Sequence, residues 1–501
     1  MNHKLRRWVV IFALLLGLLP ASAAAAPKTL IIGLSNEPGD LDPHYAAHAS
    51  AFAVAEALFD SLVIADYDGR IVPLLAESWT VLDETTIEFV LRRDVVFHNG
   101  EPFDARSVKF SLERAKDPAK QTALQAAFAS VREVEIVDDY TVRIRLHEPD
   151  SSLLWNLTRL AMVPPEYIER VGDVEFGRRP VGTGPFRFVE WVRDSHVLLE
   201  ANPDYFPGGL KGKPQVDRVL FRVVPERATR LAELRTGGLH LIERLSPDAV
   251  PLAERAGLHV VPADSGRFYV VWFRIREDSP LADRRVRLAL NYAINREAIV
   301  QAVFGGYASP LATPFTPSTF GWRPDLAPYP YDPAKARQLL AEAGYGNGLT
   351  LTLDVTTGSA EIGQLIAGQL AEVGVQVVLR PLEVSLFNSN WVNRKTGDLL
   401  GASWGGAGDP QAYLEALIHS QGFLSGYANP RADALIDQSA RTLDEQARRE
   451  VLYELQEVLY EDPAGIYLWS VADIYAYSPR LVNWRPHPTD RLIIGEATLR
   501  D

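Results

Sequence analysis

The chain contains no cysteine among its 501 residues. Without cysteine there can be no disulfide, no thiolate metal site, no cysteine nucleophile and no lipid attached at a cleavage-site cysteine. Beyond the first 20 residues no apolar run reaches the roughly 18 residues that a membrane-spanning helix needs. We therefore expect a protein stabilised by a large packed core, soluble once its first residues are removed.

Several functional signatures are also missing. The sequence has no Walker A pattern, no G-x-G-x-x-G and no H-E-x-x-H, so we expect no cofactor and no ATPase activity in this chain. Its formal net charge is -13, and no basic stripe interrupts the acidic surplus. Nucleic acid and anionic membranes are therefore not expected as partners.

The N-terminus has the pattern of a secretory signal peptide. Three basic residues in 1–7 precede an apolar stretch at 8–19, and the small residues that signal peptidase reads follow at 21–23. The apolar stretch is shorter than a membrane span. The pattern predicts that residues 1–26 are removed on export to the periplasm, and without cysteine the protein is not a lipoprotein.

A chain of this length exceeds the roughly 250–300 residues at which a single core stops growing, so at least two domains are expected. Strand and helix signals alternate, which indicates a mixed α/β fold. Strands are predicted at 29–34, 85–92, 134–137, 141–146, 218–224, 268–275, 349–355 and 375–380. Helix N-caps are predicted at Asp104, Asn295, Asp332 and Asp444. Proline- and glycine-rich breaks near 178–185, 261–266 and 477–480 are candidate domain crossings.

Motifs in a fixed order along the chain resemble the family 5 extracellular solute-binding proteins, which are the dipeptide, oligopeptide and nickel receptors of ABC importers. The motifs are LDPH (41–44), the segment 75–114 from LAESW to SLER, VGTGPFRF (181–188), ANPDYF (201–206), LADRRVRLALNYAINREAIV (281–300), YDPAKARQLLAEAGY (331–345) and YANPRADALID (427–437). Together they extend over most of the chain, which makes the likeness more specific than any one motif.

The resemblance implies a two-lobed periplasmic-binding-protein-like fold of type II, similar to cluster C, with an extra inserted domain. Domain I would combine 27–60, 179–265 and 479–501, domain II would span 61–178, and domain III would span 266–478. Hinge motion would close the lobes over a solute. The liganded protein, expected to be a monomer, would then dock on an inner-membrane ABC permease.

Residues 401–405 fit G-x-S-x-G, the nucleophile elbow of serine hydrolases. An elbow needs a helix directly after the serine, whereas Ser403 is followed by three glycines and a proline within seven residues, which favours a loop. A secreted hydrolase using Ser403 is therefore the remote alternative. We expect no catalytic residue and no enzyme.

The same stretch resembles the glycine-rich loop in the cleft wall of the family, between Trp404 and Asp409. Peptide receptors usually carry an acid four residues before the loop's proline, where it pairs with the peptide's ammonium group. That position here is Gly406, and the spacing from Trp404 to Pro410 is similar to that of nickel-type receptors. Peptides or peptide-like solutes lead as ligands, and nickel or another metal chelate is the alternative. Asp409 is either a substitute for the acid or a turn cap.

Five further residues are candidates for ligand binding. Tyr45 and His48 follow LDPH, where the resemblance places the cleft mouth. Arg159 lies near the position of an arginine that faces an anionic chelator in nickel-type receptors, and a surface salt bridge is its other reading. Tyr269 is predicted on a strand near the hinge. His419 follows the Asp-Pro step, as a histidine does in nickel receptors, although the spacing differs and an exposed helix position is the alternative. No metal site of the protein's own is expected.

Overall fold

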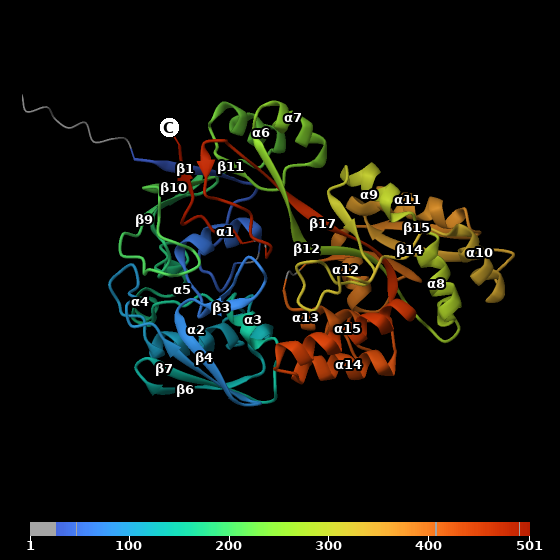
Figure 1. Cartoon of the computed structure of the whole chain (residues 1–501), viewed down its shortest axis with the longest axis horizontal. Helices are drawn as coiled ribbons and strands as arrows, with labels where there is room; N and C mark the ends of the chain where they lie inside the picture. The colour runs from blue at the N-terminus through green and yellow to red at the C-terminus, as the bar shows by residue number, and fades with distance from the viewer. Residues whose placement is uncertain (1–26, 47, 406–407, 490, 501) are drawn as a thin grey trace, which may run out of the picture.

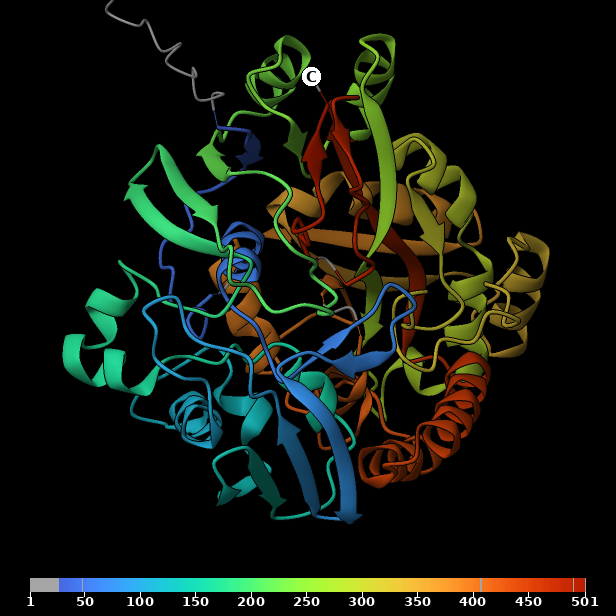
Figure 2. The ribbon, with the colours of Figure 1, turned by 60° about the vertical axis from the view of Figure 1, so that its left-hand side comes forward.

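The structure is a computed structural model that describes residues 27–46, 48–405, 408–489 and 491–500. The predicted signal peptide, 1–26, lies outside these residues. The chain forms two lobes joined by two long strands, β12 (His259–Phe273) and β17 (Gly465–Tyr477). Figures 1 and 2 both show β12 and β17 side by side as they run from one lobe into the other. They belong to an 11-stranded sheet that extends through both lobes.

At the candidate domain crossing predicted for 261–266, the chain continues without a loop as part of β12. The register of β12 against β17 instead shifts between Asp264 and Phe268. Ser265, within the shift, donates a hydrogen bond from Oγ to the carbonyl of Val471 at 2.6 Å. A bulge of this kind bends a strand without ending its pairing, and it lies where the strand passes from one lobe to the other.

The left lobe of Figure 1 holds one end of the large sheet and both chain ends. The strands there are β1 (Thr29–Leu34), β8 (Phe186–Val192), β9 (His196–Ala201), β10 (Arg218–Val223) and β11 (Leu241–Ile242), and the chain ends with the small pair β18 (Leu481–Val482) and β19 (Thr498–Leu499). The helices are α1 (Ala49–Leu58), α6 (Arg227–Thr236) and α7 (Val250–Arg255). One hydrophobic core combines residues from 30–59, 163–241 and 475–499, so three distant stretches fold together. The predicted domain limits themselves remain a prediction.

A second, antiparallel sheet forms the lower part of the same lobe. Its strands are β4 (Ala76–Asp83), β5 (Thr86–Leu91), β6 (Val131–Asp138) and β7 (Thr141–Leu146), in the order β4-β5-β7-β6. The short pair β2 (Val63–Ala65) and β3 (Ile71–Pro73) lies nearby, with helices α2 (Ala105–Lys116), α3 (Leu153–Leu157), α4 (Pro165–Val171) and α5 (Asp173–Phe176). Ile87, Phe89, Val142 and Ile144 are buried, as their alternation with polar residues predicts. The hairpin predicted over 134–146 is confirmed.

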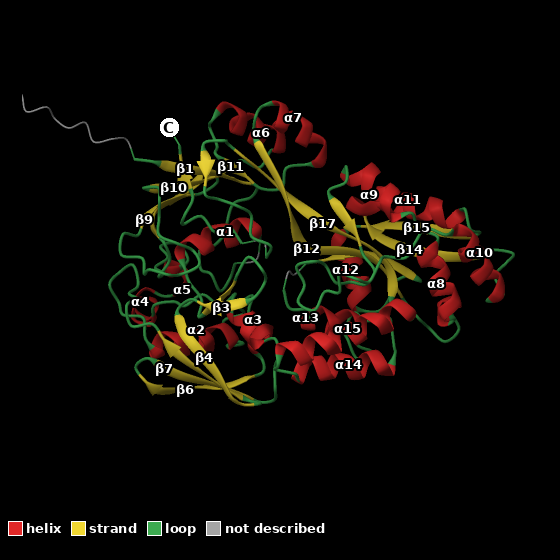
Figure 3. Ribbon diagram, in the orientation of Figure 1, coloured by secondary structure: helices red, strands yellow, loops and turns green. Residues whose placement is uncertain are grey.

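The right lobe contains the other end of the large sheet, covered by helices (Figure 3). Its strands are β13 (Ala308–Pro310), β14 (Leu349–Thr356), β15 (Val375–Leu382) and β16 (Leu399–Trp404). Its helices are α8 (Arg284–Tyr292), α9 (Arg296–Phe304), α10 (Pro333–Glu342), α11 (Ala360–Ala371), α12 (Val384–Val392), α13 (Gln411–Tyr413), α14 (Pro430–Arg441) and α15 (Glu445–Glu461). Alternate residues of β12 enter two different cores, Tyr269 and Val271 on one face and Val270 and Trp272 on the other. This strand is therefore covered on both faces.

All four predicted helix caps are confirmed. Asp104, Asn295, Asp332 and Asp444 each accept a hydrogen bond from a backbone N–H in the first turn of the helix that follows. Within the described residues, no helix is long and apolar enough to cross a membrane.

Candidate interlobe binding site

A cavity of about 460 Å³ lies between the lobes. Most of its wall belongs to the left lobe, where α1 contributes Phe52 and the segment after α3 contributes Arg159. Arg267 enters it from the bulge of β12, Gly405 from the loop after β16, and Arg491 from the C-terminal tail. Figure 1 shows α1 and α3 on the side of their lobe that faces the other lobe. The volume falls within the range of sites for small molecules.

The cavity wall is rich in cationic side chains. Its charged members are Arg159, Lys211, Arg244, Arg267, Arg491, Glu56 and Asp60. The two acids are already paired: the ammonium of buried Lys211 lies 3.0 Å from Glu56 and 3.3 Å from Asp60. Burial alone would raise the pKa of the Glu56 carboxyl, but Lys211 and Arg491 outweigh it and lower that pKa to about 2. The wall therefore offers a ligand more positive than negative charge.

Arg159 has no ion pair or side-chain hydrogen bond with any part of the chain that the structure describes. Its guanidinium carbon stands 6.0 Å from the centre of the Phe52 ring. The side chain keeps accessible surface that opens to the cavity. Although Arg159 is exposed to solvent in the cavity, partial desolvation by the surrounding walls, followed by repulsion from Arg491, lowers its pKa. An arginine placed in this way suits a bidentate contact with a carboxylate.

A second cationic group lies at the linking strands. Arg267 donates a hydrogen bond to Asp473 of β17 at 2.5 Å, and Arg244 lies 3.7 Å from the same carboxylate oxygen. Arg244 has a left-handed backbone with φ of 56°, which is uncommon for a residue other than glycine. Asp473 thus holds two arginines at the edge of the cavity, on the strands about which the lobes would move.

The two lobes touch beside the cavity. Ser151, just before α3, donates from its backbone N–H to the carbonyl of Ala440 at 2.9 Å and from Oγ to the carbonyl of Ser439 at 2.8 Å. These carbonyls lie in the last turn of α14, where helix carbonyls lack partners within the helix. Arg448 of α15 donates to the carbonyl of Ser151 at 3.4 Å. Figure 1 shows α3 beside α14. The lobes are therefore in direct contact here, in addition to being joined by β12 and β17.

Of the eight predicted site residues, Arg159 is the one that lines this cavity among the described residues. Gly406 lies outside the described residues. Trp404 ends β16 and is half-buried, and its neighbour Gly405 lines the cavity instead. Asp409 accepts hydrogen bonds from the guanidinium of Arg448 and, at 2.9 Å, from the backbone N–H of Gln411. These bonds support the turn-cap reading of Asp409.

The other candidates do not line this cavity. The hydroxyl of Tyr45 donates to the carbonyl of Lys120 at 2.8 Å, and His48 is the N-cap residue of α1 without a side-chain capping bond. His419 lies 3.5 Å from the carboxylate of Asp437. Ligand contact by these residues remains a prediction.

Tyr269 stacks on Trp469, with ring centres 5.7 Å apart, and lines a separate hollow of about 350 Å³ in the right lobe. Burial raises the pKa of the Tyr269 hydroxyl to about 12. Its contact with ligand likewise remains a prediction.

The nucleophile-elbow reading of Ser403 is wrong. Ser403 lies inside β16, paired with Tyr269 of β12, and not at a turn between a strand and a helix. Its hydroxyl donates to the carbonyl of Phe268 at 3.1 Å, where a hydrolase would need a histidine.

Two α/β lobes joined by two long strands, with a charged cavity between them, define a solute-binding receptor. Residues 70–425 match the profile of the bacterial extracellular solute-binding proteins, family 5, and the chain belongs to this family. It is a solute-binding protein of an ABC importer, not an enzyme.

The chain is 30% identical over 520 aligned positions to the glutathione-binding protein GsiB of Pectobacterium atrosepticum, covering 99% of both chains. Among solved structures, HbpA2 from Haemophilus parasuis has a TM-score of 0.86 at 24% identity, covering 95% of this chain and 100% of that one. The periplasmic binding protein DppA from Helicobacter pylori, in complex with the peptide STSA, has a TM-score of 0.73 at 25% identity, covering 95% of this chain and 99% of that one.

Proposed function

We propose that the chain is the periplasmic receptor for a short peptide-like solute with at least two carboxylates, of the glutathione type, which it delivers to an inner-membrane ABC permease. The observation that carries the proposal is Arg159, a cavity arginine without an anionic partner in the described chain. The predicted signal peptide supports export to the periplasm.

The charge of the cavity favours this class of solute over an ordinary dipeptide. Glutathione carries two carboxylates and one ammonium group near neutral pH. Arg159 in the left lobe is one cationic group, and Arg267 with Arg244, which share the carboxylate of Asp473 at the linking strands, is a second; together they suit two carboxylates. Glu56 and Asp60 are held by Lys211, so neither is free to bind an ammonium group. The similarity to a glutathione-binding protein over almost the whole chain supports the same class.

A metal chelate is the second candidate. The spacing from Trp404 to Pro410 favours it, and Arg159 would suit the carboxylates of an organic chelator as well. In this reading the metal is cargo held by its chelator, and the arginines bind the chelator's carboxylates.

Native mass spectrometry of protein purified from the periplasm without denaturation tests the proposal. A co-purified species of tripeptide mass that contains a thiol or disulfide would support it. A metal isotope pattern would favour the chelate, and a ladder of unrelated peptide masses would contradict a dedicated dicarboxylate receptor. As a matched comparison, glutathione and the neutral dipeptide Ala-Ala are each added to protein stripped of its ligand, and their binding is compared.

A further inference from the structure

A second pocket, of about 290 Å³, lies within the right lobe and shares no lining residue with the interlobe cavity. It opens near the end of β12 that is farther from the bulge. Apolar side chains form much of its wall, among them Trp272, Trp391, Leu417 and Leu424. Three arginines also line it: Arg274, Arg276 and Arg394. Apolar walls and several guanidinium groups are therefore combined in one small space.

The arginines outnumber the acids that neutralise them. Arg276 pairs with Asp398 at 2.7 Å and lies 4.0 Å from exposed Asp278. Arg274 and Arg394 have no carboxylate within 4.0 Å in the described chain. Burial, followed by repulsion from Arg276 and Arg394, lowers the pKa of Arg274. A bound anion would relieve this repulsion.

Within the described chain, Arg274 and Arg394 donate to uncharged oxygens: Arg274 to the carbonyl and the hydroxyl of Thr396, and Arg394 to a carbonyl. Arg274 donates to Thr396 at 3.0 Å and Arg394 donates to Gly422 at 3.1 Å. A guanidinium has five N–H donors, so each keeps donors for a ligand.

The backbone at Arg394 is strained for an arginine. It has a φ of 54° directly after the C-cap of α12, where its N–H donates to the carbonyl of Trp391 at 3.0 Å. Glycine is the usual residue at this left-handed position, because any β-carbon there costs free energy. Arginine at this position is less stable than glycine would be, and it places its guanidinium at the pocket.

The indole of Trp272 forms part of the pocket wall. Trp272 is 6% exposed, and its Nε1 is buried with no acceptor among the described residues. By contrast, the indole N–H of neighbouring Trp391 donates to the carbonyl of Leu424 at 3.0 Å. A buried donor without a partner is destabilising and is rare in folded proteins. Because Trp272 lines the pocket, its indole signal reports on a molecule bound there.

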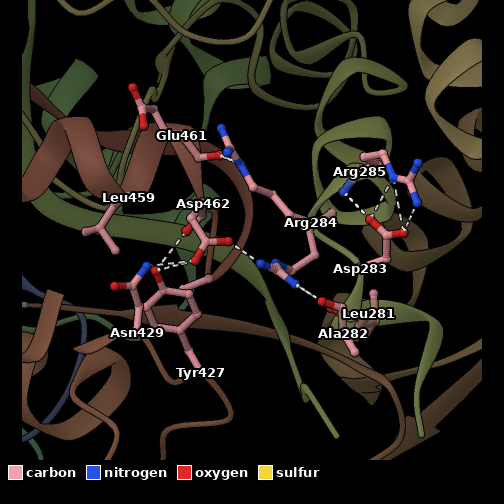
Figure 4. A network of polar contacts seen from close by, with 12 residues as sticks. Leu281, Ala282, Asp283, Arg284, Arg285, Tyr427, Asn429, Leu459, Glu461 and Asp462 are labelled. Atoms are coloured by element: carbon pink, nitrogen blue, oxygen red, sulfur yellow. Dashed lines mark hydrogen bonds and ion pairs between the residues drawn. The ribbon is translucent and has the colours of Figure 1, made fainter. Parts of the chain in front are cut away.

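The wall of the pocket is held in place from behind. Tyr427, which lines the pocket, donates from its hydroxyl to the backbone carbonyl of Asp462 at 3.0 Å. Asn429 donates to the Asp462 carboxylate at 2.8 Å, and Arg287 pairs with it from α8. Figure 4 shows Tyr427 and Asn429 converging on Asp462. The pocket is thus formed before any ligand arrives.

We propose that this pocket is a second binding site, for a small organic carboxylate with an apolar body. The carboxylate would lie between Arg274 and Arg394, and the apolar part would pack on Trp391 and Leu424. The site is independent of the interlobe cavity and of the solute that the cavity takes. A walled pocket of this size fits a free small molecule better than a segment of a folded partner.

The experiment follows the indole N–H signals of the protein labelled with ¹⁵N-tryptophan during titration with benzoate. The Trp272 signal is assigned from its absence in Trp272→Phe. We expect this signal to shift and saturate with benzoate but not with benzamide, which has the same shape and no charge. The double variant Arg274→Ala with Arg394→Ala should bind benzoate at least about tenfold more weakly. Arg159→Ala, in the interlobe cavity, should leave benzoate binding unchanged.

Arg394→Gly keeps the experiment informative if the double variant folds poorly. Because glycine suits the left-handed backbone, this variant should melt at the same or a higher temperature and yet bind benzoate more weakly. The proposal is overturned if the Trp272 signal does not shift, if benzamide shifts it equally, or if Arg394→Gly binds benzoate as the unmodified protein does.

Discussion

Trp155 of the left lobe and Gly408 of the right lobe approach so closely that a β-carbon on residue 408 would lie 1.7 Å from Cζ2 of Trp155. The contact adjoins the cavity, because Trp155 also lines it. With the bonds from Ser151 to the end of α14, it forms the interface across which the lobes meet. Gly408 also has a φ of 104°, so two separate requirements favour glycine there.

Gly408→Ala should hold the lobes apart and weaken ligand binding by at least about tenfold, because the arrangement of the lobes in the structure leaves no room for the methyl group. Small-angle X-ray scattering with and without ligand measures closure, and calorimetry measures affinity. Trp155→Ala in the same chain removes the clash but not the backbone strain. A double-mutant cycle therefore separates the effect of the clash from the effect of the backbone strain. Closure of Gly408→Ala as complete as in the unmodified protein would contradict this role.

Ser151→Ala should speed ligand release with little effect on the stability of the unliganded protein. The variant loses one hydrogen bond between the lobes, worth about 0.5–1.5 kcal/mol, which corresponds to roughly a two- to twelvefold effect. Stopped-flow measurement of the dissociation rate tests this. Ser152→Ala is the matched control, because the Ser152 hydroxyl bonds to Asp150 within its own lobe at 2.6 Å. Equal release rates in the two variants would show that the Ser151 bond does not stabilise the closed state.

The ion-paired carboxylate of Glu56 should make the free energy of unfolding depend on pH in the acidic range. Its pKa is lowered from 4.5 to about 2 in the folded protein, so its stabilisation is present above about pH 4.5 and is lost as pH falls towards 2. The full effect is about 3 kcal/mol. Urea unfolding at several pH values measures the free energy of unfolding. Near pH 6 this free energy should be much lower for Glu56→Gln than for the unmodified protein, and the difference should shrink towards pH 3. A loss independent of pH would mean that the carboxylate charge is not what stabilises the fold.

Features encoded in short stretches of sequence could be predicted, and features assembled from distant stretches could not. The hairpin near 134–146 and the cap at Asp332 depend on neighbours a few residues away, so local patterns were sufficient. The wall of the cavity combines Phe52, Arg267 and Arg491, which no local pattern connects. Arg159 was found only because a family resemblance pointed to it.

Two interpretations of single residues depended on surroundings that the sequence does not show. Asp409 has the right residue type and a suggestive place in the chain, but its partner Arg448 lies 39 residues away and became visible only in the fold. Ser403 fits a catalytic pattern that depends on a sharp turn, and the pattern does not report that the chain there is a strand. Residue type identifies what a side chain can do, whereas its partners decide whether it is free to do it.

The most direct test of the account is calorimetry of glutathione binding to the unmodified protein and to Arg159→Ala. Losing a charged hydrogen-bond partner costs about 1.5–3 kcal/mol, so affinity should fall by roughly 10- to 150-fold. Arg255→Ala, an exposed arginine on α7 outside the cavity, should bind as the unmodified protein does. Equal affinities for Arg159→Ala and the unmodified protein would contradict the claim that this unpaired arginine recognises the solute.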